Sequence, residues 1–472
     1  MKSLFTTFLF SLISLFCFSQ NTEFSALQTD LNIKNAYEQF LSDGYVSSRS
    51  QPKSEYKSDL KSYYKTRYAS SLQRLENDHF IMHPSVSVYL DQLLDIIAQS
   101  NSTFNFDEVR VLLAKYVWPN AFSVGDGTLV LNIGLAMRLE NEAQLAFVLS
   151  HEAAHYLLNH SDEDFIRRFY DKNSDAFKAK LEEINKSEYY QVTKLKELLK
   201  SNIYSERSHS RVHEFSADSL GLVFYLNAGY DISGAISTLE LLDRLNEPIP
   251  DKVNIFTRLN IDTIAYPKAS LNLVDLERED VLEMDSVKTH PDCYKRIVAI
   301  VAMGSTGNAE INYKTEAFID FKDAVNSEVV HCHLFFDAVG DALIHSLNQE
   351  EEKEMTPENA SAIVISAHRM VHARKKHRIS TVISSPSRED TSAVNDLARI
   401  AHGLRFSIFS KALYALAKEK YASAIKDKNT MYEMLAFSYL MKDKELFPIV
   451  KASYLEKFPN KKENKAIMDM SL

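Results

Sequence analysis

The chain has 472 residues, of which 45% are hydrophobic and 25% are charged, and its formal net charge at neutral pH is −10. A length of this order suggests two or three domains. With 11 glycines and 11 prolines, the chain is far below the roughly 12% share of these residues in an average protein, which favours a mostly helical fold. The acidic balance argues against binding of nucleic acid, because phosphate groups would require basic patches.

The first 20 residues have the pattern of a secretory signal peptide. Lys2 gives a positive start, residues 4–18 form an apolar run, and Ser19-Gln20 is a suitable cleavage region. A membrane-spanning helix needs about 20 predominantly apolar residues, and no segment after the signal peptide meets this requirement. We therefore expect a secreted protein with no transmembrane segment after residue 20. Residues 21–74, which follow the signal peptide, are expected to form a polar and helical segment.

Three short β-strands are predicted ahead of the most informative motif. Residues 109–118 have the pattern of a buried strand, and residues 120–123 and 128–133 have the pattern of two more. Gly125-Asp126-Gly127 is typical of a turn between the last two strands. The sequence thus predicts a mainly α fold with a small β-sheet.

The sequence HEAAH at residues 151–155 has the spacing of a zinc-binding helix. Residues four apart lie on one face of a helix, so both imidazoles can reach one metal ion. Glu152 is then placed to act on a metal-bound water. Asn141 and Gln144 form a capping-box pattern, and apolar residues recur at helical spacing, so we predict a buried helix over residues 141–160.

A second helix offers the third metal ligand. Catalytic zinc takes imidazole nitrogen and carboxylate oxygen and keeps one position open. Glu214 would complete the set begun by His151 and His155, and Asp218 lies four residues further on, hence on the same helix face. From there Asp218 would hydrogen-bond His151 and fix its tautomer. Two nearby histidines remain as alternative ligands, His209 and His213.

The residues after the motif exclude a different zinc-peptidase pattern, that of the metzincins. That pattern needs a histidine six residues after His155, where this chain has Ser161, and His160 is out of phase by one position. Residues 161–208 instead form a highly charged insertion with helical periodicity. Such an insertion beside a metal site could form a lid or a partner surface.

Further patterns surround the motif in a fixed order. Upstream stand Asn120-Ala121-Phe122-Ser123, Gly125-Asp126-Gly127 and Gly134-Leu135; downstream stand Glu214-x-x-Ala217-Asp218, Ala228-Gly229-Tyr230-Asp231 and Thr289-His290-Pro291 with Arg296-Ile297. Over roughly residues 75–305, these patterns resemble the gluzincin metallopeptidases related to the CAAX prenyl proteases and the HtpX heat-shock proteases. Because no apolar span follows the signal peptide, the chain resembles the soluble periplasmic branch of these peptidases, which includes the bacterial beta-barrel-assembly-enhancing protease.

The resemblance implies a zincin-like domain over residues 75–305, one zinc ion and polypeptide substrates. It implies a zinc-dependent endopeptidase that acts on secreted or envelope proteins in the bacterial periplasm, in protein quality control. Glu152 would accept the proton of a zinc-bound water and deliver it to the leaving amine. An extended substrate would pair with residues 120–122 as an added strand. His290 would lie near the metal, either stabilising the tetrahedral intermediate or occupying the open position in a latent enzyme, and Arg296 would anchor its loop through a salt bridge.

Residues 306–472 are predicted to form a separate C-terminal helical domain. Residues 394–408 have the pattern of one amphipathic helix, and residues 431–460 resemble one tetratricopeptide hairpin. No 34-residue self-similarity accompanies that hairpin, so a helical bundle and a repeat array both remain open. If this region binds envelope assembly partners or clients, the rival function is an envelope chaperone with latent or secondary proteolysis. Function that survives Glu152→Gln would favour this rival.

Overall fold

The computed structural model describes residues 27–50, 57–186, 210–245, 251–261, 293–304, 314–353, 355–387, 390–460 and 462–472. These residues form two compact units. The N-terminal unit contains the described residues from Leu27 to Leu245, helix α12 (Cys293–Met303) and the chain up to Asn326. The C-terminal unit contains residues 251–261 and those from Ser327 onward. The predicted signal peptide and the predicted site residue His290 lie outside the described residues.

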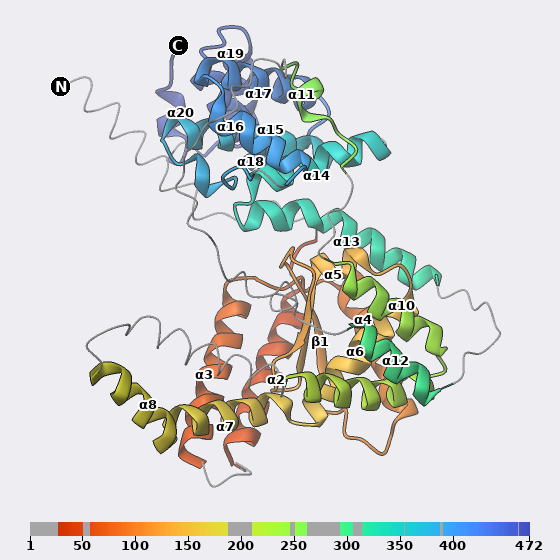
Figure 1. Cartoon of the computed structure of the whole chain (residues 1–472). Helices are drawn as coiled ribbons and strands as arrows, with labels where there is room; N and C mark the ends of the chain where they lie inside the picture. The colour runs from red at the N-terminus through yellow and green to blue at the C-terminus, as the bar shows by residue number, and fades with distance from the viewer. Residues whose placement is uncertain are drawn as a thin grey trace. The chain divides into compact units, whose positions relative to one another are not determined.

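The N-terminal unit consists of helices around one small sheet, which confirms the predicted fold class (Figure 1). An unlabelled helix at residues 210–227 belongs to this unit, and α13 (Glu316–Phe335) starts in it and continues into the C-terminal unit. The remaining helices are α2 (Leu31–Ser50), α3 (Lys57–Glu76), α4 (Pro84–Ser100), α5 (Ile133–Arg138), α6 (Glu142–Leu157), α7 (His160–Asn173), α8 (Asp175–Lys186) and α10 (Ile232–Asp243).

The sheet has the strand order β1-β3-β2. β3 (Thr128–Asn132) pairs in parallel with β1 (Arg110–Ala114) and antiparallel with β2 (Ala121–Ser123). The β2–β3 turn requires glycine, because Gly127 has a φ of 92° and an added Cβ would lie 1.8 Å from a backbone carbonyl oxygen. β1 ends earlier than the predicted strand over residues 109–118, because its partner β3 ends at Asn132, opposite Ala114, and α5 begins at the next residue.

Both faces of this sheet are covered by helices. Leu112 and Val130 pack in one buried cluster with residues of α2 and α3. Successive strand residues point to opposite faces, and α4 and α6 contact the sheet as well (Figure 1). β3 is buried along its whole length, and α6 packs against both β2 and β3, so the sheet helps to fix the position of α6.

Helix α6 lies at the centre of the N-terminal unit. Its N-cap residue, Asn141, accepts a hydrogen bond from the backbone N–H of Gln144, and the Gln144 side chain accepts one from the backbone N–H of Glu140. Every residue from Ala143 to Ala154 is buried. Packing on all faces therefore fixes both the position and the rotation of the helix that carries the HEAAH sequence.

The C-terminal unit is helical around one large apolar core. α15 (Pro357–Lys375) packs against α14 (Val339–Glu352), α17 (Phe406–Tyr421) and α18 (Lys428–Leu440), and α18 packs against α19 (Leu446–Lys457). The prediction of one helix over residues 394–408 is wrong, because Leu404 and Arg405 are extended and separate two helices. In the described parts of the chain, no helix combines the length and apolar character needed to cross a membrane. The other helices of the C-terminal unit are α11 (Ile255–Arg258), η4 (Ile379–Thr381), α16 (Ala393–Gly403) and α20 (Lys465–Met468).

Candidate metal centre

Three side chains from two helices face one another inside the N-terminal unit. His151 and His155 lie on α6, and Glu214 lies on the helix at residues 210–227. The Nε2 atoms of the two histidines are 3.1 Å apart. Oxygens of Glu214 lie 3.6 Å from Nε2 of His151 and 3.5 Å from Nε2 of His155. The structure thus brings together the three residues that the sequence predicts as metal ligands.

The spacing of these donor atoms fits a tetrahedral zinc site. Zinc binds nitrogen and oxygen ligands at about 2.0–2.2 Å, so two ligand atoms of a tetrahedral site are about 3.3 Å apart. The observed separations of 3.1, 3.5 and 3.6 Å lie on either side of this value. Among the described residues, these three form the group of His, Cys, Asp and Glu side chains that could hold a metal ion. Two imidazoles and one carboxylate are also a donor set that catalytic zinc accepts.

A buried ion pair supports two of these three side chains. Oδ1 of Asp218 lies 3.0 Å from Nδ1 of His151. From α12, Arg296 donates two hydrogen bonds of 2.6 Å to the two oxygens of Asp218, and its Nη1 lies 3.0 Å from Glu214. Arg296 is 1% exposed and Asp218 is 2% exposed. The pair therefore holds His151 with Nε2 toward Glu214, and outer hydrogen bonds of this kind orient metal-binding imidazoles.

Burial and the neighbouring charges move the pKa values of the site's groups in opposite directions. Burial acts to raise the pKa of Asp218, but hydrogen bonds from Arg296 and His151 hold it at about 2. Burial lowers the pKa of His151. For His155, burial also acts downward, but Glu214 and Glu152 raise the pKa overall. The carboxylates thus favour a positive charge between the two imidazoles, which is the charge a metal ion would bring.

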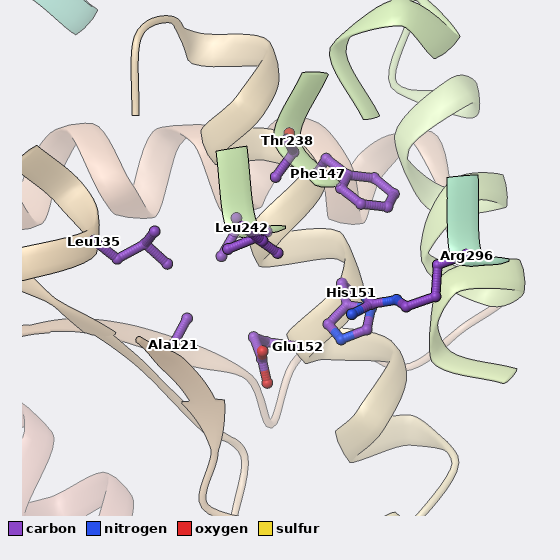
Figure 2. Close-up of a pocket in the computed structure, with 9 residues that line it drawn as sticks. Ala121, Leu135, Phe147, His151, Glu152, Thr238, Leu242 and Arg296 are labelled. Carbon is purple, nitrogen blue, oxygen red and sulfur yellow. The ribbon is translucent and has the colours of Figure 1, made fainter. Parts of the chain in front are cut away.

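Glu152 lies on a small pocket that is also lined by His151, one of the three donor residues (Figure 2). Glu152 is buried, with 3% of its surface exposed. His151 and Arg296 line the same pocket, and Ala121 lines it from β2. A carboxylate in such a water-poor place can exchange a proton with a bound reactant. The other lining residues are mostly apolar and are Leu135, Phe147, Val148, Thr238 and Leu242.

The three residues predicted to receive an extended substrate lie at the edge of the sheet. Ala121 is buried on the pocket, while the Phe122 side chain packs against the apolar cluster of α2, α3 and the sheet. Asn120 precedes β2, and its carbonyl oxygen accepts a hydrogen bond from the backbone N–H of Asn132. In the described part of the chain, β3 is the one strand that pairs with β2.

The two alternative ligands have different outcomes. Nε2 of His213 lies 3.2 Å from Glu163, and its Nδ1 lies 3.5 Å from Asp164, so the structure places its ring with these carboxylates. His209 lies outside the described residues, as does His290. Arg296 lies in α12 and forms salt bridges with Glu214 and Asp218, while the loop that it is predicted to anchor lies outside the described residues.

Two residues near the site were missed from the sequence. Nδ1 of His160 lies 2.8 Å from Nδ1 of His155. At Gly221, an added Cβ would lie 2.9 Å from Cα of His151, so this glycine allows the two helices to approach closely. A glycine inside a helical pattern often has such a packing role and could have been found. His160 gave no signal, because its spacing from His155 is out of phase on a continuous helix.

Residues 84–303 match the sequence model of peptidase family M48. The matched segment contains α6, the helix at residues 210–227 and α12, and so contains all three candidate ligands with Glu152 and Arg296. No curated protein matches the chain. Together with the donor set, the family match supports a zinc-type metallopeptidase domain over residues 84–303.

Proposed function

We propose that this chain is a zinc-dependent endopeptidase. The observation that carries the proposal is the meeting of His151, His155 and Glu214 beside Glu152 and a pocket that reaches β2. The match to peptidase family M48 covers the same residues and supports it. Bound by those three side chains, zinc would supply a Lewis acid that polarises the substrate carbonyl and acidifies the attacking water.

Glu152 is the general base of the proposed reaction. It accepts a proton from the water that attacks the peptide carbonyl, and it then delivers this proton to the leaving amine. Its position next to His151 in the chain and its place on the pocket support this role. Asp218 and Arg296 contribute by keeping His151 and Glu214 in place.

An extended polypeptide is the proposed substrate. Its main chain would add to the edge of β2 along residues 120–122, in the manner of strand addition. Ala121 supports this path, because it lies both on β2 and on the pocket that contains Glu152. From the resemblance, His290 is proposed to lie near the reacting carbonyl or to occupy the open metal position in a resting enzyme.

The proposed setting is the quality control of secreted or envelope proteins in a bacterial periplasm. It rests on the signal-peptide pattern of residues 1–20 and on the resemblance to periplasmic relatives. Envelope assembly partners would then bind through the C-terminal helical unit.

Cleavage of an unfolded protein such as casein by residues 21–472 tests the proposed reaction. Loss of a general base costs on the order of 10²- to 10⁴-fold in rate, so Glu152→Gln should lose cleavage on this scale while keeping its zinc. The control is Glu183→Gln, which changes an exposed glutamate on α8 and should cleave as the wild type does. Equal cleavage by Glu152→Gln and the wild type would refute the role of Glu152.

A further inference from the structure

A series of side-chain contacts leads from His155 to the helix that carries Glu214. Nδ1 of His155 lies 2.8 Å from Nδ1 of His160, and Nε2 of His160 lies 3.1 Å from Oγ of Ser216. Oγ of Ser216 lies 3.0 Å from the backbone carbonyl oxygen of His213. We infer that His160 and Ser216 are positioning residues that hold His155 with an unprotonated Nε2 toward the metal site; this inference rests on the proposed function.

The direction of every hydrogen bond in this series follows from its last member. A backbone carbonyl oxygen only accepts, so the single proton of the Ser216 hydroxyl is donated to His213. The Ser216 oxygen can then only accept from His160, which places the proton of His160 on Nε2. A neutral imidazole carries one proton, so Nδ1 of His160 accepts, and Nδ1–H of His155 donates to it. The lone pair of His155 Nε2 is thereby left for the metal site.

A local break in the chain aims His160 at His155. On a continuous helix, a residue five positions further on would point about 140° away. Here α6 ends at Leu157, and Asn159 adopts a left-handed conformation with a φ of 59° before α7 begins. Asparagine tolerates this conformation better than most residues. The turn therefore brings the His160 ring back to the metal-facing histidine.

The His160 ring is also fixed from its other side. It stacks on His213, with ring centroids 4.1 Å apart and an angle of 8° between the planes. His213 in turn lies 3.2 Å from Glu163 and 3.5 Å from Asp164 on α7. His160 itself is 6% exposed. Held in this way, the ring can impose its hydrogen-bonding direction on His155.

Residues 214–218 of one helix thus help to position both of the histidines that are proposed to bind the metal. Glu214 faces the two imidazoles directly, Asp218 contacts His151, and Ser216 ends the series from His155. His160 contacts His155 in the same way as Asp218 contacts His151. Each of the two contacts is made to the Nδ1 atom of the histidine, which faces away from the metal site. Outer partners of metal-binding histidines fix the ring orientation and the tautomer in this manner.

The zinc affinity of the full chain, measured by competition with a chromophoric chelator, tests the inference. His160→Phe keeps an aromatic ring that can stack but removes both nitrogens, and loss of such an outer partner weakens metal binding on the order of 10- to 100-fold. Ser216→Ala removes the far hydrogen bond and should weaken zinc binding by roughly 3- to 10-fold. His160→Gln, whose amide both accepts and donates, should recover part of the loss. Ser219→Ala is the matched control, because its hydroxyl donates within the same helix to Phe215 and should leave zinc affinity unchanged.

The melting temperature of the metal-free chain separates positioning from a purely structural role. Positioning predicts a weaker zinc affinity with a melting temperature close to that of the wild type; a structural role predicts the reverse. If His160→Phe does not fold, Ser216→Ala decides. Wild-type zinc affinity in the folded variants would overturn the inference alone, whereas a wild type that takes up no zinc would overturn the proposed function and the inference with it.

Discussion

Replacement of Arg296 by leucine should destabilise the N-terminal unit strongly. The Arg296 guanidinium donates two hydrogen bonds of 2.6 Å to Asp218 and lies 3.0 Å from Glu214. With an exposure of 1% for Arg296 and 2% for Asp218, leucine would leave the carboxylates buried without this counter-charge. Removal of one partner of a buried ion pair costs about 3–5 kcal/mol, because the remaining charge does not regain its hydration.

Urea unfolding, followed by tryptophan fluorescence, measures the loss in the free energy of unfolding of the N-terminal unit. Trp118 is the single tryptophan of the chain, and it stacks on Tyr116 in the N-terminal unit, with ring centroids 4.6 Å apart. For a slope of about 2–3 kcal/mol per molar urea, the expected loss moves the midpoint by about 1–2.5 M.

The control for this prediction is a matched arginine in the same unit. Arg168 lies 3.9 Å from Asp164 and its side chain is 54% exposed. Exposed pairs contribute about 0–1 kcal/mol, so Arg168→Leu should shift the midpoint little. Equal midpoints for Arg296→Leu and Arg168→Leu would refute the reasoning.

Three further predictions concern packing, pH and a half-buried lysine. Gly221→Ala places a Cβ 2.9 Å from a backbone atom of α6 and should cost about 1–3 kcal/mol in the fluorescence assay; Gly44→Ala, whose Cβ would meet its nearest atom at 3.6 Å, should not destabilise. Burial acts to raise the pKa of Glu433, but the hydrogen bond with His368 holds it at about 2, below the ordinary 4.5. The ionised Glu433 therefore stabilises the folded chain by about 3 kcal/mol above pH 4.5, and this contribution is lost as the pH falls toward 2. The difference in melting temperature between the wild type and Glu433→Gln, followed by circular dichroism, should shrink from pH 5 to pH 3. A constant difference would contradict this. Nζ of Lys322 donates to three backbone carbonyl oxygens around the end of α5, so Lys322→Met should cost about 2–3 kcal/mol in the fluorescence assay, and an unchanged midpoint would contradict that role.

The helix of the candidate site could be predicted because several levels of the sequence agree there. The Asn141 cap, the apolar periodicity and the four-residue spacing of His151 and His155 all indicate one buried helix. Glu214 and Asp218 could be predicted for the same reason, since a helix places residues four apart on one face.

The contacts that complete the site depend on tertiary structure and local breaks that periodicity does not show. His160 reaches His155 because Asn159 ends the regular helix, and the sequence around it continues the helical pattern without interruption. In the C-terminal unit, apolar residues keep the helical period across Leu404, although the backbone there is extended. A periodic pattern indicates which residues are buried. Two helices that are separated by such a break can still show one uninterrupted apolar pattern.

Metal analysis of purified residues 21–472 tests the central claim most directly. The account predicts about one zinc ion per chain in the wild type and in Glu152→Gln, and a loss of bound zinc in Glu214→Ala, because the first variant spares the three ligands and the second removes one of them. A wild type without stoichiometric zinc, or a Glu214→Ala variant that keeps all of it, would contradict the proposed metal site.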